Sequence, residues 1–224
     1  WFGDHVRLGL TANSNEEGNA DSSLGAADLT WRMTPASWFK VQGGRSEGLI
    51  SNPLKSGDGG FGFASNDPLS FTDAEADAYR ADLNIGLGDL FAGRKGNLTF
   101  YLQSLDAGYS APGQATLQDT EQIGGLVTMP VTSRLSLSAK GDQKTQDQGL
   151  ETRALEVDLG YQMTDKWMLS TGVRNDRRED KSPIVPPTQE EGERTDGVVQ
   201  VTFDPKTTWR AYGFVQDTLS ASDG

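Results

Sequence analysis

The sequence predicts an all-β fold, in which antiparallel strands run up and down as the wall of a transmembrane β-barrel. Three observations support this prediction. About eleven runs alternate apolar and polar residues, the connections between them are short and long in turn, and the tryptophans lie near the short connections or the first run. Most runs are close in length to a tilted strand that crosses a bilayer, which has about nine to eleven residues.

The eleven predicted strands follow one another with almost no helical spacing between them. They cover residues 5–12, 24–33, 38–45, 76–88, 98–109, 121–129, 134–141, 150–163, 166–175, 197–204 and 209–217. The eighth run alternates most clearly, since one face carries Leu155, Val157, Leu159, Tyr161 and Met163. Its other face carries Ala154, Glu156, Asp158, Gly160 and Gln162. Each strand is therefore expected to have one apolar and one polar face.

Three runs alternate less clearly. In the third, Trp38 shares a face with Lys40, opposite Phe39. In the fifth, Leu98 to Leu102 favour one face, whereas Leu105 and Tyr109 favour the other, which a β-bulge would reconcile. In the eleventh, Trp209 and Val215 compete with Tyr212 and Phe214 for the apolar side, so its orientation stays open.

The connections sort by length. Short turns are expected at 34–37, 89–96, 130–133, 164–166 and 204–208, and long polar loops at 13–23, 46–75, 110–120, 142–149 and 176–196. Outer-membrane barrels have short periplasmic turns and long extracellular loops, so a meander makes the two lengths alternate. A sandwich with Greek-key crossings has no reason to sort its loops in this way.

Aromatic side chains mark both predicted rims. Tryptophan and tyrosine favour the membrane–water boundary, because the ring is apolar and its N–H or O–H group is polar. The predicted interfacial aromatics near the short turns are Trp31, Trp38, Tyr161, Trp167, Phe203 and Trp209, and those near the long loops are Tyr79 and Tyr109.

Composition excludes several classes of protein. Only 35% of the 224 residues are hydrophobic, which suits a barrel that needs apolar side chains on alternate strand positions. No stretch approaches the eighteen or so apolar residues of a spanning helix. The absence of cysteine excludes disulfides, and a net charge of -12 argues against a nucleic-acid partner. We treat residues 1–224 as a single barrel segment.

Polar side chains on the opposite strand faces are predicted to line a lumen. They carry both signs of charge, so water or a plug is expected to fill the space. Alternatively, these charges only pair across neighbouring strands, and the two interpretations are compatible. The predicted lumen-lining residues are Asp28, Arg32, Lys40, Arg80, Asp82, Asn84, Lys140, Glu156, Asp158, Arg174 and Gln200.

Candidates for catalysis or metal binding are few. His5 is the single histidine, and its place at the start of the first run favours a lining or rim residue over a catalytic base. Asp73, Glu75 and Asp77 could gather oxygens around calcium, but they lack an EF-hand spacing and suit a solvated acidic loop. No enzyme, cofactor or resident metal is therefore predicted.

Short turns with the sequences Thr164-Asp165-Lys166-Trp167 and Asp204-Pro205-Lys206-Thr207-Thr208-Trp209 lead into or between alternating strands. With these turns, the chain resembles Gram-negative outer-membrane β-barrel proteins in general, over essentially its whole length. The resemblance implies location in the bacterial outer membrane, with lipid around the apolar band and lipopolysaccharide around the outer rim. It transfers no functional residue.

These features favour a barrel segment that serves as a porin-like channel, or as a scaffold or anchor for a secretion or surface assembly. Two alternatives stay open: a soluble secreted all-β binding module with long recognition loops, and an outer-membrane hydrolase. Eleven is an odd number, whereas single-chain bacterial barrels have even counts. An open edge has no hydrogen-bond partners in lipid. We therefore expect a larger barrel, with further strands from the same chain or another chain.

Overall fold

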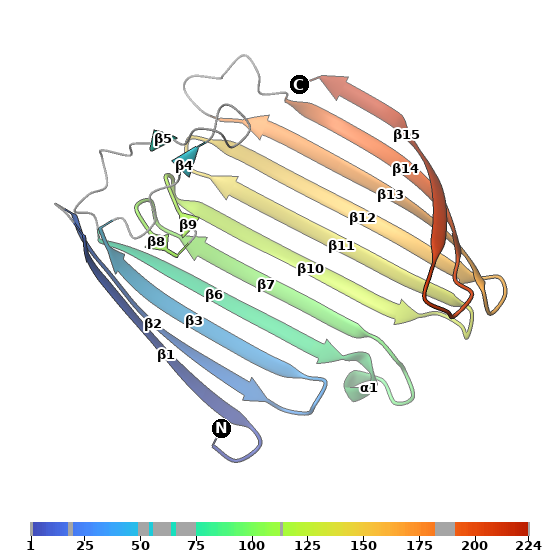
Figure 1. Ribbon diagram of the computed structural model, residues 1–224, viewed down its shortest axis with the longest axis horizontal. Helices are drawn as coiled ribbons and strands as arrows, with labels where there is room; N and C mark the ends of the chain where they lie inside the picture. The colour runs from blue at the N-terminus through green and yellow to red at the C-terminus, as the bar shows by residue number, and fades with distance from the viewer. Residues whose placement is uncertain are drawn as a thin grey trace. The chain divides into compact units, whose positions relative to one another are not determined.

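The computed structural model describes residues 2–17, 20–48, 54–55, 64–65, 75–112, 114–181 and 191–223. Its eleven long strands form one antiparallel sheet, in which each strand pairs with the next long strand along the chain (Figure 1). The strands are β1 (Val6–Glu17), β2 (Ala20–Arg32), β3 (Trp38–Glu47), β6 (Glu75–Gly86), β7 (Asn97–Leu105), β10 (Thr120–Pro130), β11 (Leu135–Gln146), β12 (Leu150–Gln162), β13 (Trp167–Asp180), β14 (Gly192–Phe203) and β15 (Ala211–Asp223). This order confirms the predicted up-and-down meander.

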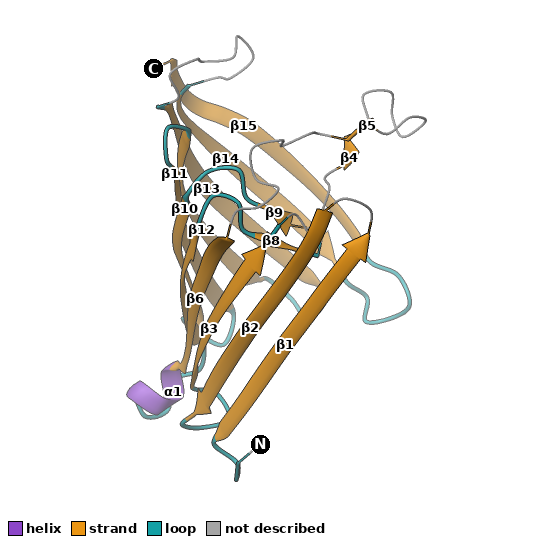
Figure 2. Cartoon of the chain, turned by 90° about the vertical axis from the view of Figure 1, so that its left-hand side faces the viewer, coloured by secondary structure: helices purple, strands orange, loops and turns teal. Residues whose placement is uncertain are grey.

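The remaining elements are short. β4 (Leu54–Lys55) pairs with β5 (Ala64–Ser65), and β8 (Ser110–Ala111) pairs with β9 (Gln114–Ala115). The helix α1 (Leu87–Leu90) lies at the end of β6 (Figure 2) and precedes β7 along the chain. Among the described residues, no helix has the length and apolar character that membrane crossing by a helix requires.

The chain divides into two compact units. The first unit comprises Trp1–Met33, Phe39–Asp82 and Leu102–Glu121, and the second comprises Thr34–Trp38, Leu83–Tyr101 and Gln122–Gly224. We describe each unit by itself. A single barrel segment over residues 1–224 stays a prediction.

Two of the predicted long loops are largely strand. β1 and β2 stay in register as far as the pair Glu17 and Ala20, within the predicted loop 13–23. β11 extends to Gln146 and β12 begins at Leu150, so most of the predicted loop 142–149 is also strand. Backbone pairing does not depend on side-chain polarity, and alternation disappears where both faces of a hairpin are polar. The predicted strand ends were therefore wrong at these two places.

The register of the second unit separates two faces. On one face, Leu159 lies between Leu137 and Thr171, and Val157 lies beside Val173. We call this side the apolar face of the second unit, which also carries Leu135, Leu155, Tyr161, Leu169, Val199 and Val201. The opposite side is its polar face, described below. Alternation along each strand thus produces continuous apolar rows across neighbouring strands.

The register also resolves the orientation of β15. Val215 pairs with Val199 and therefore lies on the apolar face, whereas Phe214 pairs with Gln200 and lies on the polar face. Tyr212 has the same parity as Phe214. The pairing of β14 with β15 shifts in register between Thr195 and Asp196, as in a β-bulge, close to the C-terminal end of β15.

In the first unit, the β1–β2 register gives the same separation. Leu8 pairs with Leu29 on the apolar face, and Gly9 pairs with Asp28 on the polar face. The polar face also carries a buried cluster of apolar side chains, with Ala111 packed against it. Its members are Leu24, Ala76, Ala78, Leu105 and Tyr109. Because Leu105 and Tyr109 belong to this cluster, their parity in the fifth run reflects local packing on the polar face.

Candidate functional site

A row of alternating charges crosses the polar face of the second unit. Lys140 of β11 pairs in register with Glu156 of β12, Glu156 with Arg174 of β13, and Arg174 with Asp196 of β14. The Arg174 guanidinium lies 3.3 Å from the Glu156 carboxylate and 2.7 Å from that of Asp176. Opposite charges on directly paired residues stabilise neighbouring strands. The sign therefore changes at each strand of the row.

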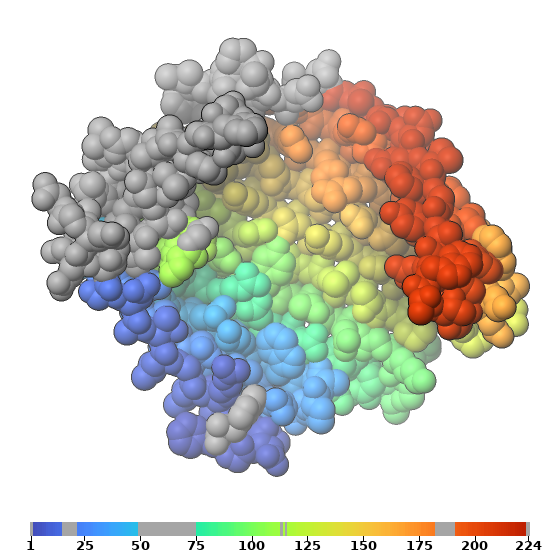
Figure 3. Space-filling model, in the orientation of Figure 1, coloured from blue at the N-terminus to red at the C-terminus, as the bar shows by residue number. Residues whose placement is uncertain are grey.

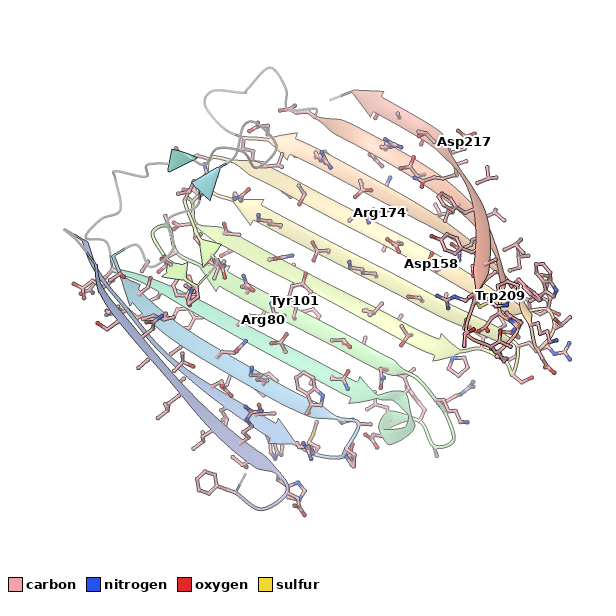
Figure 4. The ribbon with its side chains drawn as sticks, in the orientation of Figure 1. Arg80, Tyr101, Asp158, Arg174, Trp209 and Asp217 are labelled. Atoms are coloured by element: carbon pink, nitrogen blue, oxygen red, sulfur yellow. The ribbon has the colours of Figure 1, made fainter. Side chains whose placement is uncertain are left out.

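Asp158 borders a hollow next to this row. It lies between Ser138 and Gly172 in the register, and its carboxylate occupies the space that a side chain at Gly172 would need. The hollow has a volume of about 180 Å³, and Glu156, Arg174 and Asp196 also line it. Figure 4 labels Asp158 on β12 and Arg174 on β13. In the side of the molecule that Figure 3 shows, no described helix or strand covers the middle of β12 and β13.

The two predicted amide residues of the second unit make short-range hydrogen bonds. Gln200 donates its side-chain N–H to the Thr202 hydroxyl over 3.0 Å. Asn84 donates to the carbonyl oxygen of Ala36 over 2.6 Å, and it accepts a hydrogen bond from the Thr99 hydroxyl. Asn84 thus joins β6 to the preceding turn and to β7, whereas the Gln200 hydrogen bond lies within β14.

Sequence reasoning missed a polar cluster on this face. The Tyr101 hydroxyl donates to the Asp142 carboxylate, and the Gln122 amide donates to the Tyr101 oxygen over 3.0 Å. A Cβ atom at Gly124 would collide with the Tyr101 ring, so glycine leaves the space that the ring occupies. In the sequence, a glycine that lies opposite an aromatic residue on a neighbouring strand could have indicated this cluster. To recognise that Gly124 and Tyr101 are such neighbours, one must know how β7 and β10 are aligned.

The predicted polar residues of the first unit form a second group. Arg80 makes an ion pair with Asp82 at 2.7 Å and donates to the side-chain oxygen of Gln103 over 2.9 Å. Lys40 donates to the Gln42 side chain over 2.9 Å. Asp28 and Arg32 share one parity on β2, and Asp28 lies beside Gly9. A lumen next to either polar face stays a prediction.

The β8–β9 hairpin packs onto the polar face of the first unit. The backbone N–H of Ser110 donates to the Ser46 hydroxyl over 2.9 Å, and both residues are fully buried. Tyr109 is only 9% exposed and lies in the apolar cluster. The segment that follows Tyr109 gains burial by folding onto the sheet. The assignment of Tyr109 to the interface near the long loops stays a prediction.

The other predicted interfacial aromatics differ in position. Trp31, Tyr79, Tyr161, Trp167 and Trp209 are exposed. The Phe203 ring lies 4.6 Å from the Trp167 ring and 5.5 Å from the Trp209 ring, measured between centroids. Trp38, in contrast, has the parity of Lys40 and Gln42, which hydrogen-bond to each other. Trp38 therefore has the parity of the polar side, as its position beside Lys40 in the sequence suggested, and its place at the membrane interface stays a prediction. Trp1 lies outside the described residues.

His5 and the acidic loop residues have structural partners. The His5 Nδ1 atom lies 2.8 Å from the Arg32 carbonyl oxygen. Arg45 makes ion pairs with Asp77 at 2.7 Å and Glu75 at 3.5 Å, so a guanidinium already neutralises these carboxylates. Asp73 lies outside the described residues. Within the described residues, no three histidine, aspartate or glutamate side chains gather around a possible metal position.

Hydroxyl groups join two short turns of the second unit. The Asp89 carboxylate accepts hydrogen bonds from the Ser37 hydroxyl at 2.5 Å and the Thr34 hydroxyl at 2.6 Å. These bonds lower the pKa of Asp89. In the last turn, the backbone N–H and then the ammonium group of Lys206 lower the pKa of Asp204. Both carboxylates therefore favour the charged form that fastens their turns.

Each unit thus combines an apolar face with a polar face of paired charges, amides and hydroxyls. Covering such a polar face with an apolar partner would cost free energy, because its polar groups would lose contact with water. No protein-family model, no curated protein and no solved structure matches the chain.

Proposed function

We propose that the chain forms part of the wall of an outer-membrane β-barrel, in which the apolar faces contact lipid and the polar faces line a water-filled, porin-like conduit. The observation that carries this proposal is the exposure of the apolar rows. Leu155 is 57% exposed and Leu159 is 39% exposed, although both are large apolar side chains. Contiguous apolar surface of this kind marks a site that contacts lipid or a protein partner.

The height of the apolar face supports lipid as the contact. In β12 the apolar face extends from Leu155 to Tyr161 and continues with Met163 in the following turn. On the same side of the strand, the residues that precede Leu155 are the charged Arg153 and Glu151. The interval from Leu155 to Met163 is about 27 Å along an extended strand. A strand tilt of about 40° reduces it to about 21 Å, close to the apolar band of about 25 Å in transmembrane barrels.

The polar faces favour the function of a conduit rather than that of a scaffold that only anchors another protein. In the second unit, charged side chains pair with neighbours of the same face, such as Arg194 with Asp196 at 2.8 Å. Charges that pair with one another tolerate water above them and need no packed protein core.

The sheet edges determine which partners the proposal requires. Among the described strands, β1 and β15 each pair with one neighbour in the sheet. Unpaired backbone groups along an edge are too costly in lipid. The wall therefore needs further strands at these edges, from the same chain or from another chain. Outer-membrane lipid and lipopolysaccharide are the other partners.

A charge placed on either face tests the proposal. Leu159→Arg puts a guanidinium into the apolar face, and we expect the free energy of unfolding in phospholipid vesicles to fall by about 2–4 kcal/mol. Ser138→Arg is the matched control, because Ser138 lies on the polar face and pairs with Asp158. We expect its effect to be below about 1 kcal/mol. Equal losses, or a folded and monodisperse protein in buffer without detergent, would favour the soluble binding module.

A further inference from the structure

We propose that a hollow on the polar face of the first unit binds one neutral, oxygen-rich molecule of about the size of a single sugar ring. The hollow has a volume of about 190 Å³, and β2, β3, β6, β7 and the β8–β9 hairpin provide its walls. The residues that carry the argument are Gln42, Arg80, Gln103, Tyr109 and Gln114. This volume is below the range of about 300–1,000 Å³ for drug-sized sites, which limits the ligand to a small molecule.

Hydrogen-bond donors without a protein partner converge on this hollow. The carbonyl oxygen of the Gln42 side chain accepts from Lys40, and that of Gln103 accepts from Arg80. Within the described residues, the amide nitrogens of both side chains have no hydrogen-bond partner, although both side chains are partly buried. Among the described residues, neither nitrogen is a buried atom cut off from solvent, so both are accessible donors in the hollow. Two accessible donors in one hollow can bind a ligand with acceptor oxygens.

Tyr109 and Gln114 add polar groups from the hairpin side. The Tyr109 side chain is almost completely buried, but its hydroxyl reaches solvent and has no hydrogen-bond partner among the residues that the structure describes. The Gln114 amide likewise has none in the described part of the chain. A hydroxyl both donates and accepts, as does a carboxamide. The hollow can therefore bind hydroxyl groups, which also do both.

The charge balance favours a neutral ligand. The Arg80 guanidinium donates to both oxygens of Asp82, from Nε over 3.1 and 2.9 Å and from Nη2 over 2.7 Å. This pairing neutralises the cation that lines the hollow. Ala26, Ala78 and Leu105 supply apolar wall next to the donors. A sugar ring has C–H groups on its faces and hydroxyls at its rim, so it matches both kinds of surface.

The hollow is preformed, because the hairpin is held in place. The Ser110–Ser46 hydrogen bond holds the start of the hairpin, and the Thr116 N–H donates to the Tyr109 carbonyl oxygen over 2.9 Å. A Cβ atom at Gly44 would lie 3.3 Å from the Tyr109 hydroxyl and 3.2 Å from the Ala26 Cβ, so glycine leaves room for the ring. A preformed site loses little conformational entropy when a ligand binds.

This inference goes beyond the conduit, since the hollow can bind a ligand whether or not the polar face lines a channel. The test is a titration of the full chain in detergent micelles with methyl α-glucoside, followed by saturation-transfer NMR. We expect saturable binding. Gln103→Met and Gln42→Met should each weaken it about 3- to 10-fold, because each variant removes one donor. Tyr109→Phe should weaken it by a similar factor while retaining the ring.

Gln216→Met is the matched control, since Gln216 lies on the polar face of β15 in the second unit and outside this hollow. Its affinity should equal that of the unmodified chain. Should one hollow variant fail to fold, the other two decide the outcome. The inference is overturned by absence of saturation, by equal affinities in all variants, or by tighter binding of glucose 6-phosphate than of methyl α-glucoside. None of these results depends on the Leu159→Arg measurement in lipid.

Discussion

The polar faces of the two units differ, although both belong to strands with the same alternation. In the first unit, the β8–β9 hairpin covers part of the face, and an apolar cluster that includes Tyr109 is buried there. In the second unit, Lys140, Glu156, Arg174 and Asp196 form a row of partly exposed charges. Alternation thus determines which side of a strand is polar, whereas a connecting loop determines whether that side is covered.

The difference also separates two means of stabilising a polar face. The first unit buries apolar side chains on it, so its stability there depends on packing and on the hydrophobic effect. The second unit depends on ion pairs between partly exposed groups, which contribute little individually. We therefore expect the first unit to be sensitive to lost volume, and the second to be sensitive to salt.

The largest effect is expected from Tyr109→Ala. Removal of a buried aromatic side chain leaves a cavity, and we expect the free energy of unfolding to fall by about 3 kcal/mol. Met168→Ala is the matched change on the polar face of the second unit, where Met168 pairs with Thr202 and is partly exposed. We expect a loss of about 1 kcal/mol there. Denaturant titration in the same micelles measures both, and equal losses would remove the proposed difference between the faces.

A smaller effect is expected when an arginine is removed from each face. Arg174→Ala separates the cation from Glu156 and Asp176, and about half of the Arg174 side chain is exposed. We expect a loss of about 1 kcal/mol at low salt, which decreases at 1 M salt because salt screens exposed charges. Arg80→Ala leaves the less exposed Asp82 without its partner. Its loss should depend less on salt, and identical salt dependence would contradict the comparison.

The smallest effect is expected at the short turns. Hydrogen bonds from Ser37 and Thr34 lower the pKa of Asp89 in the folded state. A lowered folded pKa contributes stability above the unfolded pKa of about 3.9, and this contribution is lost as the pH falls through the folded pKa. Asp89→Asn should therefore lower the Tm slightly at pH 7 and flatten its decline below about pH 4. An unchanged acid profile would show that this carboxylate contributes nothing to the turn.

The strand number and order could be predicted from the sequence, because apolar and polar residues alternate in the segments with one apolar face. The ends of β1, β2 and β11 could not, since residues such as Asn13 and Lys144 continue the pairing where both faces are polar. Pairing in such hairpins depends on the backbone and leaves no alternation in the sequence.

The charged residues of the polar faces could be predicted one by one, but their partners could not. Which carboxylate lies beside Arg174 depends on the register, and a shift of one residue would reverse every face. The packed hairpin was also missed, because residues 106–119 are mostly small or polar and show no period. The one indication in the sequence was that Leu105 and Tyr109 lie on the opposite strand face from Leu98 and Leu102, and a β-bulge would also explain this.

The chain has no cysteine, so single cysteines can be placed along β12 from Ala154 to Tyr161 and labelled with a fluorophore in lipid vesicles. Quenching by nitroxide-labelled lipid and by aqueous iodide then reports what each position contacts. We expect lipid quenching at 155, 157, 159 and 161, and iodide quenching at 154, 156, 158 and 160, with a period of two residues. Iodide quenching at all positions, or quenching without this period, would contradict the assignment of the apolar face to lipid.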